Sequence, residues 1–138
     1  MRVEQDVKLT FEDVLIRPKR STLVSRSDVT LEREFKFRHS STTWSGVPIV
    51  AANMDTTGLF SISKILQQHK MITCLQKFYA TREYAAAWDD GVDPNFIAAT
   101  CGSTEESLTL LKRKMATNEK IKFICIDVAN GYSENFSK

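Results

Sequence analysis

The chain has 138 residues, of which 42% are hydrophobic and 26% are charged. This length and apolar content indicate a globular protein with a sizeable core and argue against disorder. The 19 basic and 17 acidic residues leave a net charge of +2, so neither a nucleic-acid partner nor a membrane partner is expected. Charged residues near the N-terminus, such as Glu4, Asp6 and Lys8, exclude the apolar core of a signal peptide, and no run is long enough to span a membrane. We therefore expect a cytoplasmic protein.

Residues 1–44 differ in pattern from the rest of the chain. A short helical turn is predicted over residues 10–16, and Pro18 would end it. Residues 28–38 alternate between apolar and polar side chains, which is typical of a half-exposed antiparallel strand. We predict an N-terminal extension over residues 1–44 that contains a strand or hairpin, followed by a second region over residues 45–138.

From residue 45 onward, short apolar runs alternate with stretches of helical spacing. The four runs are residues 47–52, 71–75, 96–101 and 123–128. Continuous apolar runs of this kind suit strands that are covered on both faces, as in parallel sheets. Their starts lie about 25 residues apart, which is the length of a strand with its crossover helix. The pattern therefore predicts an α/β fold with a parallel sheet.

Apolar side chains at helical spacing predict three helices between these runs. Thr81 is expected to cap the second helix, and Gly91 to close it in the left-handed conformation. Residues 103–106 form a capping box before the third helix, and Lys112 and Lys114 stand where the helix dipole favours cations. A fourth helix would begin at Ser133, too near the end of the sequence to be complete. The side chains expected on the three apolar faces are Leu59, Ile62, Ile65 and Leu66; Tyr84 and Trp88; and Leu108, Leu111 and Met115.

Polar side chains follow the predicted strands at their carboxyl ends, where ligands bind in parallel sheets and barrels. Lys77 stands next to Phe78 and Tyr79, which suits an anionic ligand or a stacked ring; a solvated lysine is the alternative. Asp127 can accept two hydrogen bonds from ribose hydroxyls, or it can cap the loop that follows it. Asp55 follows the first strand and can equally cap the first helix.

Other standard sites are not indicated. The stretch from Arg17 to Arg26 contains no acidic residue and allows phosphate contact, with solvated surface as the alternative. Neither of the standard glycine-rich phosphate loops occurs in the sequence. Cys74, Cys101 and Cys125 lie in or at the end of apolar runs without a C-x-x-C pair, so we expect no metal site, disulfide framework or catalytic thiol.

Five segments together carry a specific signature. They are residues 11–23 (FEDVLIRPKRSTL), 25–27 (SRS), 44–55 (WSGVPIVAANMD), Lys77 and 126–134 (IDVANGYSE). With these segments the whole chain resembles the N-terminal part of GMP reductase, in the family that also contains IMP dehydrogenase. The reductase is favoured because the dehydrogenase typically ends its first strand in Ser-Pro-Met-Asp and its fourth in Asp-Ser-Ser-Gln-Gly. The dehydrogenase also usually carries a pair of CBS domains, for which the segment between the second helix and the third strand leaves no room.

The resemblance implies NADPH-dependent reduction of GMP to IMP with release of ammonia, in purine nucleotide salvage. It also implies a (β/α)₈ TIM barrel that assembles as a tetramer, with residues 45–138 as the first half of the barrel, about four strands of eight. The residues that the resemblance assigns to NADPH are Lys77, Asp127, Val128 and Ala129, with Ser25 and Arg26 from a neighbouring subunit, and it assigns Met54 to the substrate nucleotide.

The chain departs from the family pattern at a few positions. Gln76 and Phe78 flank the matching lysine where the family commonly has histidines, and Thr57 replaces a usual valine. The family's nucleophilic cysteine, its threonine partner and its potassium-binding loop follow the sixth strand, which this sequence does not reach, so the 138-residue chain alone is expected to be inactive. Two alternatives stay open: a non-catalytic product that pairs with full-length subunits, and IMP dehydrogenase-type oxidation of IMP with NAD.

Overall fold

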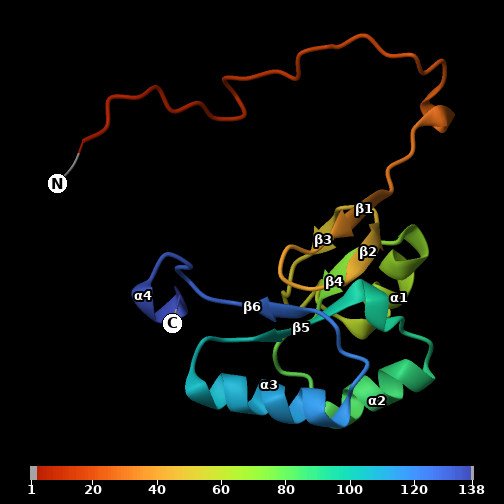
Figure 1. The fold of residues 1–138 in the computed structure, drawn as a ribbon, viewed down its shortest axis with the longest axis vertical. Coiled ribbons are helices and arrows are strands. Elements are labelled where there is room, and N and C mark those ends of the chain that lie inside the picture. Colours follow the sequence, from red (N-terminus) through yellow and green to blue (C-terminus); the bar gives the residue numbers. More distant parts are fainter. Residues whose placement is uncertain (1–2, 138) are drawn as a thin grey trace. The chain divides into compact units, whose positions relative to one another are not determined.

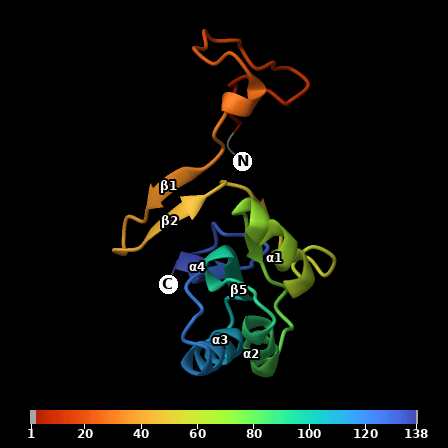
Figure 2. The ribbon, with the colours of Figure 1, turned by 90° about the vertical axis from the view of Figure 1, so that its right-hand side faces the viewer.

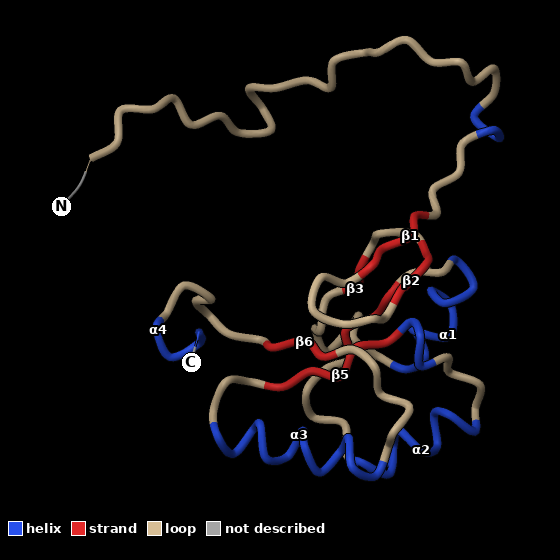
Figure 3. Tube along the Cα trace, in the orientation of Figure 1, coloured by secondary structure: helices blue, strands red, loops and turns tan. Residues whose placement is uncertain are grey.

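The computed structural model describes residues 3–137, which divide into two units, one up to Thr30 and one from Leu31 onward. None of the described helices is both long and apolar enough to cross a membrane. In chain order the elements are η1 (Arg26–Asp28), β1 (Arg33–Lys36), β2 (Thr43–Gly46), β3 (Val50–Ala51), α1 (Phe60–Leu66), η2 (Gln67–His69), β4 (Ile72–Cys74), α2 (Thr81–Asp89), η3 (Pro94–Phe96), β5 (Ile97–Cys101), α3 (Glu105–Thr117), β6 (Ile124–Ile126) and α4 (Glu134–Ser137) (Figures 1 and 3).

The first unit consists of extended chain and short turns, with η1 near its end (Figure 3). The helical turn predicted from residue 10 is a tight turn: Thr10 O accepts the N–H of Asp13 at 3.1 Å, and the Asp13 carboxylate accepts the N–H of Thr10 at 2.8 Å. The bond from the N–H of Thr10, together with one from Thr10 Oγ1 to the same carboxylate at 2.9 Å, holds the pKa of Asp13 below its ordinary value. Phe11 and Leu15 are 98% and 97% exposed, so this segment has no core of its own.

β1 and β2 form an antiparallel hairpin at the start of the second unit. Arg33 pairs with Gly46 and Lys36 with Thr43, and the rings of Phe35 and Trp44 lie 6.0 Å apart. The antiparallel strand predicted over residues 28–38 is confirmed only for Arg33–Lys36, because pairing begins at Arg33. All four of its residues are exposed, so the prediction of a half-exposed strand is wrong.

The second unit also contains a four-stranded parallel sheet in the order β3-β4-β5-β6. This arrangement confirms the prediction of an α/β fold with a parallel sheet. The register places Val50 beside Ile72, and Ala99 beside Ile124. β3 and β6 are edge strands, and Ile124 and Ile126 are 44% and 46% exposed. The expectation that every strand is covered on both faces is therefore wrong for these two.

The core lies between β5 and the helices α2 and α3, which pack side by side on one face of the sheet (Figures 1 and 2). All five residues of β5 are buried. Alternate residues of a strand point to the same face, so Ile97, Ala99 and Cys101 meet the helices together. The buried side chains of this core are Leu75, Tyr84, Ala87, Val92, Ile97, Ala99, Cys101, Leu111 and Ile121.

The helix ends follow the predictions in part. Gly91 has φ +84°, which confirms that it closes α2 in the left-handed conformation. The N-cap of α2 is Ala80, whose N–H donates to the Glu83 carboxylate at 2.6 Å, so the predicted capping role of Thr81 is wrong. Thr104 caps α3 by accepting the N–H of Ser107 at 3.2 Å, so the capping box predicted over residues 103–106 is wrong. α1 begins after Leu59 without a side-chain cap, so Asp55 does not cap it.

Two side chains hold the segment between α2 and β5. Gln67 Nε2 donates to Gly91 O at 3.0 Å, and Gln67 Oε1 accepts the N–H of Asp93 at 2.7 Å. Trp44 Nε1 donates to Asn95 O at 2.9 Å. The hairpin is thereby attached at the amino end of β5, opposite to the end where ligands bind in parallel sheets.

Candidate functional site

The four parallel strands end at the same edge of the sheet, and the loops that follow three of them carry predicted site residues. Met54 follows β3, Lys77 follows β4, and Asp127 follows β6. In parallel sheets this edge is where loops converge on a ligand. Among the described residues, no hydrogen bond or ion pair joins the side chains of these three residues to one another.

The loop after β3 is folded tightly around Met54. Met54 O accepts the N–H groups of Thr57 at 3.1 Å and Gly58 at 2.7 Å, and Thr57 Oγ1 donates to Ala52 O at 2.9 Å. A Cβ on Gly58 would lie 2.7 Å from both Cys74 O and Gln76 N, so only glycine allows this close approach to β4. The Met54 side chain is 60% exposed and available to a ligand.

The loop after β4 holds Lys77 between two anchored neighbours. The N–H of Gln76 donates to Gly58 O at 2.8 Å, and Gln76 Oε1 accepts the N–H of Phe78 at 2.7 Å. The Gln76 side chain therefore shapes the loop locally. Lys77 Nζ is exposed and lies 5.5 Å from the centroid of the Phe78 ring, while Lys77 O accepts from Lys114 Nζ at 3.3 Å.

Asp127 directly continues β6. Its N–H donates to Cys101 O at 2.8 Å, and its side chain is exposed and makes no hydrogen bond within the described part of the chain. The following turn is held instead by Asn130 Oδ1, which accepts the N–H of Tyr132 at 2.9 Å. Asp127 therefore does not cap its own loop, and its carboxylate oxygens face solvent. Val128 is half-buried and Ala129 is exposed.

Ser25 and Arg26 lie in the first unit, around η1. Ser25 Oγ accepts the N–H of Ser27 at 3.2 Å, and the N–H of Ser25 donates to the Asp28 carboxylate at 2.9 Å. This reciprocal capping fixes the backbone from which the exposed Arg26 side chain projects.

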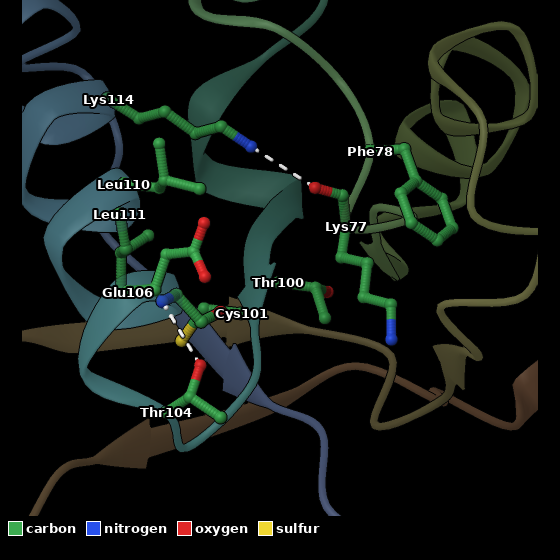
Figure 4. A pocket seen from close by; sticks show the side chains of 10 residues that line it. Lys77, Phe78, Thr100, Cys101, Thr104, Glu106, Leu110, Leu111 and Lys114 are labelled. Atoms are coloured by element: carbon green, nitrogen blue, oxygen red, sulfur yellow. Dashed lines mark hydrogen bonds between the residues drawn. The ribbon is translucent and has the colours of Figure 1, made fainter.

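A pocket of about 210 Å³ lies between the Lys77 loop, the end of β5 and α3 (Figure 4). Thr100 at its floor is 2% exposed, and its Oγ1 has no hydrogen-bond partner. Ser107 Oγ accepts the N–H of Gly102 at 2.7 Å, which joins α3 to the end of β5. The lining residues are Lys77, Phe78, Thr100, Cys101, Thr104, Glu106, Ser107, Leu110, Leu111 and Lys114.

Electrostatics at this pocket favour binding over nucleophilic chemistry. Burial lowers the pKa of Lys114, opposed by the Glu83 carboxylate and by Cys101, and Lys114 Nζ lies 5.7 Å from the centroid of the Tyr84 ring. Cys101 is 3% exposed, and burial, with a contribution from Cys125, raises the pKa of its thiol. A protonated, buried thiol is a poor nucleophile. No group of three or more His, Cys, Asp or Glu residues in residues 3–137 is placed to hold a metal ion.

The sequence predicts only that Lys114 complements the helix dipole, and the structure places it beside Lys77 as well. Helical spacing carries a signal for the side of α3 on which Lys114 lies, but not for its partner. Lys114 stands three residues after Leu111 and four before Asn118, both of which are buried, so helical spacing puts it on the flank of α3 that faces the protein. The stem of a lysine can lie along such a surface while the amino group reaches a polar partner.

Comparison of the sequence with curated proteins finds close relatives. The chain is 48% identical over 139 residues to GMP reductase of Tolumonas auensis and 50% identical over 139 residues to GMP reductase of Klebsiella pneumoniae. Each match covers 99% of this chain and 40% of the relative, so the chain spans about 40% of the length of these relatives. No protein-family model matches the chain.

Comparison of the structure finds a similar fold in inosine 5′-monophosphate dehydrogenase from Legionella pneumophila, with a TM-score of 0.68 and 24% sequence identity. The similarity covers 92% of this chain and 37% of that protein. The sequence relatives confirm the resemblance inferred from the five segments: nearly the whole of this chain is similar to about 40% of the length of curated GMP reductases.

Proposed function

We propose that this chain is the N-terminal part of an NADPH-dependent GMP reductase, which converts GMP to IMP with release of ammonia in purine salvage. The observation that carries the proposal is the identity of about one residue in two to curated GMP reductases over 99% of the chain. The parallel sheet would form part of a (β/α)₈ barrel, with residues 1–44 as an extension and residues 45–138 as its first half. A cytoplasmic tetramer that binds potassium is part of the same proposal.

The residues at the carboxyl ends of the parallel strands fit a nucleotide cofactor. Lys77 offers an exposed cation for a phosphate, and Asp127 offers carboxylate oxygens without a hydrogen-bond partner in the described chain for ribose hydroxyls. In this proposal NADPH would supply the hydride when bound. The residues that bind and orient NADPH are Lys77, Asp127, Val128 and Ala129. Ser25 and Arg26 reach the cofactor of a neighbouring subunit, and Met54 lies against the substrate nucleotide.

The product of the complete reading frame that contains residues 1–138 provides the test. We expect it to oxidise NADPH in the presence of GMP, with loss of absorbance at 340 nm matched by ammonia release. The 138-residue chain assayed alongside is expected to show no turnover. Turnover of IMP with NAD, without turnover of GMP with NADPH, would assign the protein to the dehydrogenase reaction.

The role of Lys77 can be tested in the same assay. Lys77→Gln is expected to raise the KM for NADPH about 10-fold or more, because it removes a charge-assisted contact to phosphate. The matched control is Lys112→Gln, since Lys112 is an exposed lysine of α3 that lines neither pocket beside Lys77. Equal KM values for NADPH in the two variants would show that Lys77 does not contact the cofactor.

A second candidate function is that of a non-catalytic product that associates with full-length subunits. The observation in its favour is the pair of edge strands, β3 and β6, with Val50 56%, Ile124 44% and Ile126 46% exposed. Unpaired strand edges with apolar side chains are templates for association. Co-expression with a full-length GMP reductase, followed by size-exclusion chromatography, would show mixed oligomers if this function holds.

A further inference from the structure

A second hollow adjoins the pocket at Lys77, on the flank of α3. It has a volume of about 440 Å³, which is within the usual range for small-molecule sites. The two hollows share Lys77, Phe78, Leu110 and Lys114, and together we call them the α3 trough. The lining residues of the second hollow are Lys77, Phe78, Tyr79, Ala80, Thr81, Leu110, Arg113 and Lys114.

Three cations line the second hollow, and none of its lining residues is acidic. These are Lys77, Arg113 and Lys114, from two different segments of the chain. Neither Lys77 nor Arg113 takes part in an ion pair among the described residues, and both are exposed. An arginine guanidinium with neighbouring lysines is the arrangement that binds a phosphate with two parallel hydrogen bonds and added charge.

The trough is held in place before any ligand binds. Lys114 Nζ donates to Lys77 O at 3.3 Å, as Figure 4 shows, and the Glu83 carboxylate fixes the N–H of Ala80 on the opposite wall. Asn118 Nδ2 donates to Thr81 O at 3.4 Å and joins the last turn of α3 to the start of α2. A ligand would therefore have to order the side chains of Lys77 and Arg113, but not the backbone that carries them.

Two further features point to a ligand that is more than a bare anion. Phe78 is 73% exposed and Leu110 is 50% exposed, so an apolar rim lies next to the cations. Thr100 Oγ1, buried at the floor of the smaller hollow, lacks a hydrogen-bond partner, and buried hydroxyls are normally paired. A nucleotide with a phosphomonoester would bring ribose hydroxyls, a flat base and a phosphate together.

We propose that the α3 trough binds a phosphomonoester carried on a ribose, with Arg113 and Lys114 joining Lys77 around the phosphate. This proposal rests on the proposed function for the identity of the nucleotide: the 2′-phosphate distinguishes NADPH from NADH, and Arg113 and Lys114 select for it. Arg113 supplies the bidentate contact. Lys114 supplies charge and positions the Lys77 loop through its hydrogen bond to Lys77 O.

Binding to the purified 138-residue chain tests the proposal without turnover. Isothermal titration with 2′,5′-ADP, NADPH, NADH and GMP compares the two sources of a ribose phosphomonoester, cofactor and substrate. We expect NADPH and 2′,5′-ADP to bind at least about 10-fold more tightly than NADH, and Arg113→Gln to remove most of that difference. Lys112→Gln, one residue away on the same helix and outside the trough, is the matched control and should retain it.

The possible outcomes separate this proposal from the proposed function. If Arg113→Gln weakens GMP instead of NADPH, the phosphomonoester site stands and its occupant is the substrate. If Arg113→Gln and Lys112→Gln bind every ligand as the parent chain does, or if the parent chain binds none of them at millimolar concentration, the trough proposal is wrong. In either of those cases the turnover assay of the complete reading frame still decides the proposed function independently.

Discussion

The buried hydroxyl of Tyr84 allows a sharp test of the core. Tyr84 is fully buried between Phe60 and Trp88, with ring centroids at 5.2 and 6.0 Å, and its hydroxyl has no hydrogen-bond partner. The substitution Tyr84→Phe keeps these ring contacts and removes the hydroxyl. We therefore expect it to stabilise the chain, although it alters one of the most buried residues of the protein.

The expected gain follows from two opposing terms. A buried, unpaired polar group costs about 1–3 kcal/mol, which the substitution recovers. The void left by one oxygen atom costs a few tenths of a kcal/mol at roughly 24 cal/mol per Å³. The free energy of unfolding should thus rise by about 1 kcal/mol, which corresponds to an increase in Tm of about 3–5 °C for a chain of this size.

The pH dependence of stability gives a second readout of the same hydroxyl. Burial, with contributions from Tyr79 and Glu83, raises the pKa of Tyr84 above its ordinary value of 10.0. Above about pH 10 the unfolded tyrosine loses its proton while the folded one keeps it, so the folded state binds more protons and stability falls as pH rises. This loss should be smaller in Tyr84→Phe than in the parent chain.

Urea unfolding followed by circular dichroism measures both effects, with Tyr79→Phe as the matched control. The Tyr79 hydroxyl accepts the N–H of Phe60 at 3.3 Å, so its removal leaves that N–H unpaired and should destabilise the chain by about 1 kcal/mol. The same chemical change is therefore expected to have opposite signs at the two positions. A Tyr84→Phe variant that is less stable than the parent would refute the reasoning.

Three further predictions concern the loop after β3, the thiol of Cys74 and the edge strand β6. Gly58→Ala should lower the free energy of unfolding by about 1–3 kcal/mol, because its Cβ would meet the backbone at 2.7 Å. The control Gly102→Ala, whose Cβ would have its nearest contact at 3.5 Å, should stay within about 0.5 kcal/mol of the parent in the same urea assay. Burial, with a contribution from Cys125, raises the pKa of Cys74 from 9.0 to about 12. Iodoacetamide at pH 8 should therefore modify Cys74 at least about 10-fold more slowly in the folded than in the urea-unfolded chain, and similar rates by mass spectrometry would contradict this. Ile126→Lys should reduce self-association of the chain in sedimentation velocity experiments, because it places a charge on the exposed β6 edge. The control Ile65→Lys, at a residue of α1 that is 56% exposed, should leave self-association unchanged. Equal effects of the two substitutions would show that the chains do not associate through the β6 edge.

Much of the second unit could be predicted because its signals are local. The spacing of Leu108, Leu111 and Met115 predicts α3, and glycine at residue 91 predicts the end of α2, since both depend on residues within a turn or two of one another. The parallel order of the sheet follows from the repeat of strand and helix. These features do not require knowledge of distant contacts.

The parts that were not predicted depend on contacts between distant segments. Asp55 has the residue type of a helix cap, but α1 begins only at Phe60, because the intervening loop is folded back by the hydrogen bonds to Met54 O and Gly58 O. The approach of Lys114 to Lys77 joins residues 37 positions apart, and no local pattern encodes it. Exposure of the apolar β6 likewise depends on its place at the edge of the sheet.

The Gln67 side chain has a consequence for changes in chain length. Its amide donates to Gly91 O and accepts from the N–H of Asp93, two groups only two residues apart along the chain. A domain inserted, or a residue deleted, between these positions would separate two partners that one rigid amide must reach simultaneously. The connection between α2 and β5 therefore has a fixed length, and the exposed turn between residues 40 and 42 of the hairpin is a better point at which to lengthen or label this protein.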